Sequence, residues 1–273
     1  MDVFAIKKGK AFELSVDEFE KQTSHEFPYY RQRKDNKKLA LYAICPECGN
    51  PIQIINLYGA EMMQNKTHLV TRYGKHTGGA VSGFPYWNET EKKNCSLYKP
   101  SPLGNTEIRT KTELSEEIKN LVENNWGRIK QDIRSIVGVN IINRVMDHMK
   151  EVFMAPKAYC YKAVNKYNIP YAMLRYQEAI SIYKTFLFDS AMSQVVKDKI
   201  NINSKYFSIK DKEIEKKEGY IDFYNIGIYL TKNQRMEDKQ YIHMVIYESD
   251  VSGKEGKHII LEEELEMKPW IYS

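Results

Sequence analysis

The sequence predicts an α+β protein with an N-terminal zinc-knuckle module, a helical middle region and a C-terminal antiparallel sheet. Three observations predict this fold class. The motif CPECG, Cys45 to Gly49, directly follows the apolar strand-like run KLALYAI. Apolar residues recur at helical spacing between Thr112 and Asn203, and the residues from Lys205 onward alternate as strands do. We therefore divide the chain into residues 1–110, 111–203 and 204–273, of which the last two can share one core.

Length and composition limit the classes of protein to which such a chain can belong. At 273 residues with 42% hydrophobic content, it can bury a core without disulfide bonds. No N-terminal segment has the features of a signal peptide and no run of about 18 apolar residues occurs, so we expect a cytoplasmic protein that does not enter a membrane. The net charge of +5 permits a polyanionic partner without requiring one. The many Lys, Asn, Ile and Tyr residues suggest an AT-rich genome, so we expect a bacterial or phage protein, plausibly from a mobile element.

The first region contains short elements. We expect a brief helix after Ser15, strands near Lys38–Ile44 and Ile52–Tyr58, and then a loop dense in Gly, Asn and Pro. This irregularity suggests that the region needs an additional source of stability.

The spacing of apolar residues and the capping residues in the middle region predict four helices. Ser115 is the expected N-cap of the first, and Gly138 is expected to end it. A second amphipathic helix stops before Pro156, and a third, 170–188, begins with proline, which favours the first turn. Asp189 can cap the fourth. The apolar face of the first helix consists of Ile118, Leu121, Val122, Ile129, Ile133 and Ile136.

The last region reads as a sheet. The segments YFSIK, YIDFYNIGIYL, YIHMVIYE and KHIILEEEL alternate apolar and polar residues. The segment SDVSGKEG between the last two predicts a hairpin connection.

The chemistry of CPECG indicates a metal site. A tight turn directs two thiolates toward one cation, the proline restricts the loop, and Gly49 tolerates the positive φ that such turns need. The motif resembles half of the site in zinc-ribbon and treble-clef proteins. A thioredoxin-like redox pair would require a helix after the second cysteine, whereas Asn50, Pro51 and a strand-like segment follow here.

A structural zinc site needs four ligands. Cys95 is the natural third, and His76, in RYGKHTGG, is our choice for the fourth, which gives the spacing C-x2-C-x27-H-x18-C. His68 is a poorer alternative because it lies in the apolar run THLVTRY. Cys160 is expected to be a small buried hydrophobic residue. The resulting set, Cys45, Cys48, His76 and Cys95, would hold a structural Zn²⁺ with no open coordination position.

The order of CPxCG, a histidine near a glycine-rich loop and a lone cysteine resembles the N-terminal part of competence-associated CoiA-like proteins. That resemblance implies a downstream restriction-nuclease-type domain, whose centre needs an Asp and a Glu-x-Lys on adjacent strands. Asp222 and Glu248 are strand-placed carboxylates, but Ser249 and Asp250 follow Glu248 and the lysine is missing. The chain departs from the pattern at that point.

No other catalytic motif is complete. GKHTGG lacks the glycine spacing of a phosphate-binding loop, and the helix bearing His148 lacks the second histidine of HExxH. We therefore predict no catalytic residue and lean towards a protein that is not an enzyme.

The segment PYYRQRKDNKK, just before the knuckle, combines stacking faces with positive charge, which favours nucleic-acid binding. We expect a non-enzymatic, zinc-stabilised protein acting near DNA or RNA, in phage or mobile-element conflict with a host. The alternatives are a metal-dependent nuclease or other hydrolase with an unrecognised centre, and an adaptor or inhibitor that contacts a larger protein assembly. The candidate nucleic-acid-binding residues are Tyr29, Tyr30, Arg31, Arg33, Lys34 and Lys37.

Overall fold

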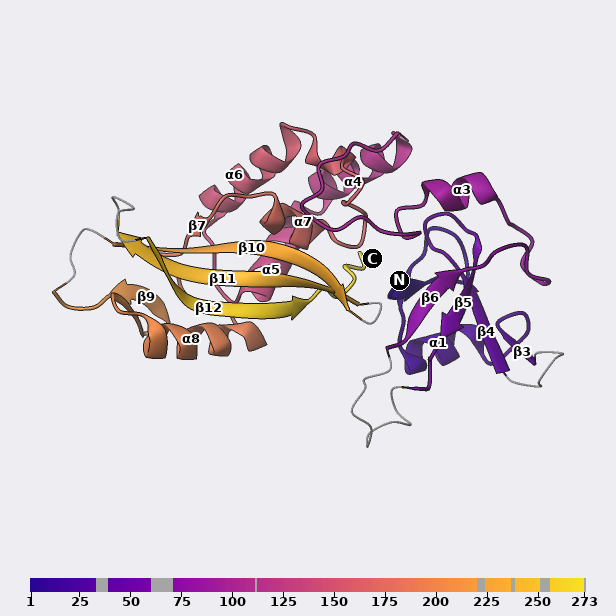
Figure 1. Ribbon diagram of the computed structural model, residues 1–273, viewed down its shortest axis with the longest axis horizontal. Coiled ribbons are helices and arrows are strands. Elements are labelled where there is room, and N and C mark those ends of the chain that lie inside the picture. Colours follow the sequence, from indigo (N-terminus) through magenta and orange to yellow (C-terminus); the bar gives the residue numbers. More distant parts are fainter. Residues whose placement is uncertain are drawn as a thin grey trace. The chain divides into compact units, whose positions relative to one another are not determined.

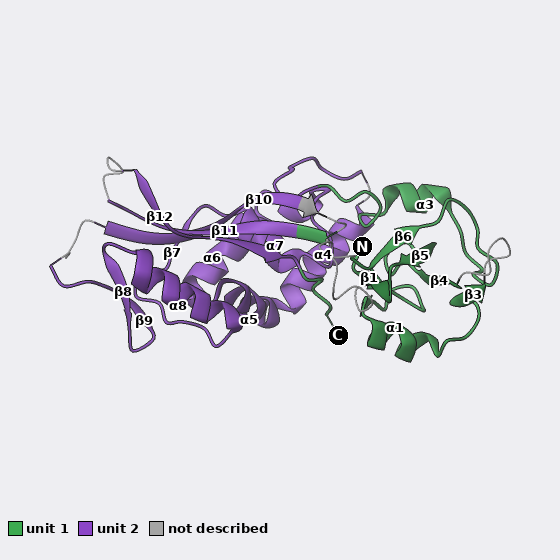
Figure 2. Cartoon of the chain, turned by 60° about the horizontal axis from the view of Figure 1, so that its bottom comes forward, with its two compact units in different colours: residues 1–101, 235–240, 268–273 green, residues 102–234, 241–267 purple. Residues whose placement is uncertain are grey.

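The computed structural model of the chain describes residues 1–32, 39–59, 71–110, 112–219, 224–236, 239–250 and 256–272. It confirms the predicted α+β class, with small N-terminal sheets, a helical middle and a four-stranded C-terminal antiparallel sheet (Figure 1). The chain forms two compact units (Figure 2). Unit 1 comprises Met1–Ser101, Arg235–Gln240 and Lys268–Ser273, and unit 2 comprises Pro102–Gln234 and Tyr241–Met267.

Unit 1 is built on an antiparallel sheet of order β3-β4-β5-β6. One helix, α1, contributes the buried side chains Val16 and Phe19 to the same apolar cluster as Leu41 and Ile52 of the sheet. The elements of this unit are β1 (Val3–Phe4), β2 (Phe12–Glu13), α1 (Val16–Thr23), β3 (Tyr30–Gln32), β4 (Leu39–Ile44), β5 (Pro51–Ile55), β6 (Tyr73–His76) and α3 (Glu89–Asn94).

The predicted helix after Ser15 is confirmed with its cap. The Ser15 hydroxyl accepts a hydrogen bond from the backbone N–H of Glu18 at 3.2 Å, which pairs one of the free donors of the first turn. The strand predicted to reach Tyr58 ends at Ile55, because Asn56 has a φ of 54° and begins a turn.

Unit 2 contains the remaining helices and most of the long strands. Its helical elements are α4 (Glu113–Asn124), α5 (Trp126–Val137), α6 (Asn143–Met154), the 3-10 helix η1 (Ala158–Cys160), α7 (Ile169–Arg175) and α8 (Ala191–Asn203). Its strands are β7 (Ile180–Ser181), β8 (Phe207–Lys210), β9 (Glu213–Lys216), β10 (Tyr224–Met236), β11 (Lys239–Asp250) and β12 (Lys257–Glu266). Strands β10, β11 and β12 form one sheet with β7, in the order β12-β11-β10-β7. Helix α8 packs against β8 and β12 (Figure 1).

The structure corrects the first predicted helix at two places. Ser115 is not an N-cap, because α4 begins at Glu113 and the Ser115 side chain is buried within the helix. The single helix expected as far as Gly138 is two helices, since the backbone of Asn125 between them is not helical, with φ −116° and ψ 20°. Gly138 does end α5, as predicted, with a φ of 73°.

The third and fourth predicted helices also differ. α7 begins at Ile169 with Pro170 in its first turn but ends at Arg175, because the apolar residues that follow form β7 and pair with β10. Ser190, rather than Asp189, occupies the N-cap position of α8. Tertiary pairing with a strand far along the chain therefore overrides the local apolar pattern.

Candidate metal centre

The two cysteines of CPECG lie in the loop that joins β4 to β5. The Cys45 N–H donates to the carbonyl of Asn50 at 2.8 Å, and the Gly49 N–H donates to the carbonyl of Cys45 at 2.9 Å. Gly49 has a φ of +74°, the left-handed conformation that the sequence predicted for this glycine. These bonds close a tight turn that places both sulfur atoms in the interior of unit 1.

The other two members of the cluster come from separate elements. His76 is the last residue of β6 and is paired in register with Ile52 of β5. Cys95 follows the last residue of α3, where its N–H donates to the carbonyl of Lys92. Three elements far apart in sequence therefore contribute to one group of side chains.

The four side chains converge as a buried Cys3His group. The three sulfur atoms and one His76 nitrogen all lie within 4.8 Å of one another. Cys45 Sγ is 3.6 Å from Cys95 Sγ, and Cys48 Sγ is 3.3 Å from His76 Nε2. Ligands about 2.0 to 2.3 Å from a tetrahedral zinc ion would be about 3.5 to 3.8 Å apart, so both separations are within about 0.3 Å of that geometry. The cluster can hold a metal ion such as zinc.

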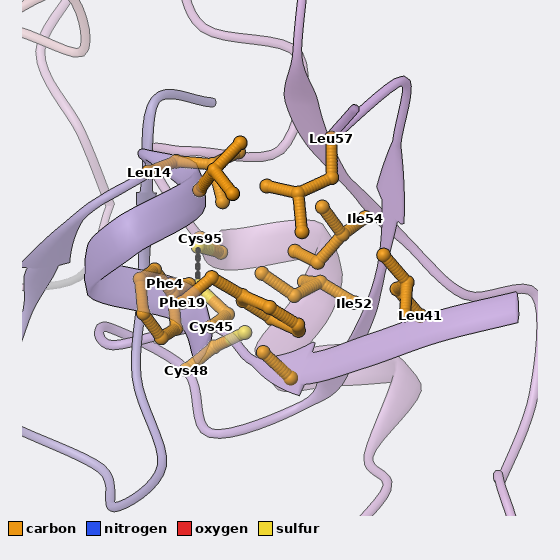
Figure 3. Packing of buried hydrophobic residues seen from close by; sticks show 12 residues of the cluster. Phe4, Leu14, Phe19, Leu41, Cys45, Cys48, Ile52, Ile54, Leu57 and Cys95 are labelled. Carbon is orange, nitrogen blue, oxygen red and sulfur yellow. Dashed lines mark hydrogen bonds between the residues drawn. The ribbon is translucent and has the colours of Figure 1, made fainter. Parts of the chain in front are cut away.

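Figure 3 shows the surroundings of the sulfur atoms. Cys45, Cys48 and Cys95 belong to the same apolar cluster as Phe4 and Phe19, with the Cys45–Cys95 contact drawn as a dashed line. A dry, apolar surrounding strengthens metal–thiolate attraction and excludes competing water.

Burial and hydrogen bonding shift the pKa values of the three thiols in different directions. Hydrogen bonds from Cys45 and Cys95, supplemented by His76 and Asn50, hold the pKa of Cys48 far below its usual range. Burial raises the pKa of Cys45, and hydrogen bonds to Cys45 and Cys48 raise that of Cys95.

A second layer of polar side chains orients the cluster. The side-chain amide of Asn50, which is fully buried, donates to Cys48 Sγ at 3.3 Å and accepts from the backbone N–H of Asn88 at 2.7 Å. The Glu47 carboxylate accepts from the backbone N–H of Ser96 at 2.6 Å and from the Ser96 hydroxyl. These residues connect the knuckle to the segments on both sides of α3, and sequence reasoning missed them because their partners lie far along the chain.

A buried cation also lies near the cluster. Lys92 donates to the carbonyl of Thr77 at 3.2 Å, and its ammonium group lies 5.5 Å from the centre of the Tyr98 ring. The Tyr98 ring in turn contacts the His76 ring edge to face, with 5.4 Å between centroids. Three thiolates around a divalent ion carry a net charge of −1, which the Lys92 charge would offset.

The remaining predicted residues have other environments. His68 and Asp222 lie outside the described residues, as do Arg33, Lys34 and Lys37. Cys160 is half-buried in η1 and is not part of the cluster.

Glu248 is fully buried, and its carboxylate is occupied by protein donors. It accepts from the hydroxyl of Ser204 and from the backbone N–H groups of Lys205 and Tyr206, and it contacts His258 Nδ1 at 2.8 Å. These contacts join the segment after α8 to β11 and β12. Glu248 therefore has a structural environment rather than that of an exposed metal ligand.

The three described members of the nucleic-acid candidate set lie on or beside β3. Tyr29 and Arg31 are half-buried, with the Arg31 guanidinium 5.8 Å from the centre of the Tyr42 ring. Tyr30 is on the α1 side of the sheet, where its ring contacts Phe19 and its hydroxyl is 3.0 Å from that of Tyr58.

Fold and cluster together define an α+β protein with a buried Cys3His group consistent with a zinc-binding module. Within the described ranges, this is the one place where three or more His, Cys, Asp or Glu side chains converge closely enough to hold a metal ion. In comparisons with protein-family models, curated proteins and solved structures, the chain matches none. None of the helices in the described part of the chain is both long and apolar enough to span a membrane.

Proposed function

We propose that this chain is a non-enzymatic, zinc-stabilised protein that binds nucleic acid. The supporting observation is that the strands bearing Tyr30, Arg31 and His76 and the loop bearing Cys45 and Cys48 belong to one sheet. Arg31 of β3 pairs in register with Ala40 of β4, and β4 leads directly into Cys45. A metal that fixes the end of β4 would therefore also fix the strand that carries the positive charge.

The proposed role of zinc is structural. Four protein ligands complete a tetrahedral shell, so no position is left for a catalytic water molecule. The ligands come from the β4–β5 loop, from β6 and from the end of α3, so one ion would join three segments of unit 1. In small zinc modules the free energy of metal binding is part of the free energy of folding.

The nuclease alternative gains no support from Glu248. A carboxylate that already accepts from a hydroxyl and two backbone N–H groups is poorly disposed to hold Mg²⁺, which needs carboxylate oxygens free to coordinate it. We therefore favour binding over hydrolysis.

The first experiment tests the metal. We expect about one zinc ion per chain in protein purified without added metal, measured by elemental mass spectrometry. Cys45→Ser should lose both the zinc and cooperative unfolding of unit 1, whereas the matched control Cys160→Ser should keep both. A Cys45→Ser protein that is folded, metal-free and impaired only in binding would contradict the structural role.

The second experiment tests binding to single- and double-stranded DNA and RNA by fluorescence anisotropy. Affinity should fall steeply between about 50 and 200 mM salt, and Arg31→Ala should reduce the salt slope by about one phosphate contact. Lys21→Ala, which removes an exposed charge on α1, is the matched control. No binding at the lowest salt concentration would overturn the nucleic-acid proposal and favour a protein partner.

A further inference from the structure

The β3–β6 sheet has a second face, opposite α1, whose composition differs from that of the core. On β4, Leu41 and Ala43 enter the apolar cluster, so the side chain of Tyr42 between them projects from the other face. Gln53 of β5 pairs in register with Tyr42, and Lys75 of β6 pairs with Gln53. One row across the sheet therefore carries Tyr42, Gln53 and Lys75 on the face that points away from the core.

Aromatic rings and a guanidinium group gather beside this row. The Arg31 guanidinium lies 5.6 Å from the Phe27 ring centre and 5.8 Å from that of Tyr42. The Phe84 ring, from the loop after β6, contacts Tyr29 edge to face at 5.8 Å and lies 6.5 Å from Tyr42. Phe27 is 62% exposed, so its ring is open to a ligand at this edge of the face.

The charged side chains on the strands of this sheet are all basic. The strands β3, β4, β5 and β6 contain no acidic residue, and neither does the segment 71–88 that supplies Lys75 and Phe84. Across the core, α1 carries the acidic residues Asp17, Glu18 and Glu20 against one lysine. The sheet face thus complements a polyanion, whereas the α1 side repels one.

We propose that this face, composed of Phe27, Tyr29, Arg31, Tyr42, Lys75 and Phe84, binds single-stranded nucleic acid. The inference rests on the proposed function and names its substrate class. Unpaired bases would stack on the exposed ring of Phe27 and on the half-buried rings of Tyr42 and Phe84, while Arg31 and Lys75 neutralise the phosphates.

The aromatic character of the face selects single strands over duplexes. In a duplex the bases stack on one another and their ring faces are not available to side chains, whereas a flat sheet face can stack two or three unpaired bases. A duplex would use only the two cations and would leave the rings without partners. Affinity for a single strand should therefore exceed affinity for a duplex of the same length.

The test measures anisotropy of a fluorescent oligothymidine and of a hairpin duplex of equal length, with the full-length zinc-loaded protein. Tyr42→Leu and Phe84→Leu should each weaken oligothymidine binding by about 5-fold to 150-fold, the range for loss of one stacked base. Phe27→Ala removes an exposed ring without touching the core, so its effect does not depend on tolerance of a core change. Tyr58→Leu, which removes an aromatic ring on the α1 side, is the matched control and should leave affinity unchanged.

The outcomes separate the two proposals. If the wild-type protein binds neither probe, the proposed function fails and this inference fails with it. If the wild-type protein binds but prefers the duplex, or if the Phe27, Tyr42 and Phe84 variants bind like the Tyr58 control, only the assignment to this face is overturned. Zinc content and thermal unfolding of each variant establish that the binding change is not a loss of fold.

Discussion

Glu47, inside the CPECG turn, should control how tightly the cluster binds zinc although it is not a ligand. Its carboxylate accepts two hydrogen bonds from Ser96, one from the backbone N–H at 2.6 Å and one from the hydroxyl. Ser96 directly follows Cys95, so these bonds fix the segment that delivers the third sulfur atom. Glu47→Ala removes both bonds, whereas Glu47→Gln keeps one acceptor oxygen.

The expected magnitude follows from these two contacts. A hydrogen bond to a charged group contributes about 1.5 to 3 kcal/mol, and partial exposure of the site reduces that figure. We expect Glu47→Ala to lower the free energy of unfolding of the zinc-loaded protein by about 2 to 4 kcal/mol, and Glu47→Gln by about half as much. Loss of such an outer-sphere contact typically weakens metal affinity by about 10-fold to 100-fold.

Zinc affinity is measured by competition with a chromophoric chelator, and stability by urea unfolding. The matched control is Glu89→Ala, because Glu89 lies on α3 close to Cys95 but makes only an exposed ion pair with Lys93 at 3.1 Å. That pair should contribute less than about 1 kcal/mol. Equal zinc affinity in the Glu47→Ala and Glu89→Ala proteins would refute the claim that Glu47 positions Cys95.

Four further changes test the two units. Gly49→Ala should destabilise unit 1 by about 1 to 2 kcal/mol in urea, because φ is +74° there, whereas Gly78→Ala, with open space around its added methyl group, should be nearly neutral. Phe19→Ala should cost about 3 to 5 kcal/mol, since that ring is fully buried. Glu248→Gln should cost about 3 to 5 kcal/mol in thermal unfolding, because it breaks a buried, charge-assisted network. Burial, followed by hydrogen bonds with neighbouring groups, raises the pKa of Tyr58, so stability should fall as pH rises above about 10, where the unfolded phenol ionises and the folded one does not.

Each of these has a result that would contradict it. Equal stability of the Gly49 and Gly78 variants would mean that the turn relaxes without strain. A loss below about 1 kcal/mol for Phe19→Ala or Glu248→Gln would place the residue outside a tightly packed site. If Tyr58→Phe shows the same alkaline loss of stability as the wild-type protein, the phenol of Tyr58 is not its source.

Short-range chemistry made the centre of unit 1 predictable. The five residues of CPECG are enough to predict its turn, because the glycine conformation and the cysteine spacing are local properties. The helix after Ser15 and the end of α5 at Gly138 were predictable for the same reason, since caps depend on one or two residues. The pairing of β11 with β12 followed from alternation alone.

Long-range pairing determined what could not be predicted. The apolar residues after Arg175 fit a helix locally, but Ile180 pairs with Ile228 of β10 and the helix stops. At Asn125 the backbone leaves the helical conformation, with φ −116° and ψ 20°, and no periodicity reveals that break. The run KLALYAI is apolar almost throughout, so only the folded sheet separates Tyr42 from the core residues, and the approach of Phe84 comes from a loop.

The proposed metal and the proposed binding face are connected through the alternation of β6. His76 points into the cluster, so its neighbour Lys75 must point out of the opposite face. The β4–β5 hairpin connects the two sites in the same way. Its loop carries the ligands Cys45 and Cys48, and its strands carry Tyr42 and Gln53 on the proposed binding face. An ion that fixes the ends of β4 and β6 would therefore set the register of the rings and cations without touching the nucleic acid. Removing zinc with a chelator should then abolish oligothymidine binding, and zinc alone should restore it.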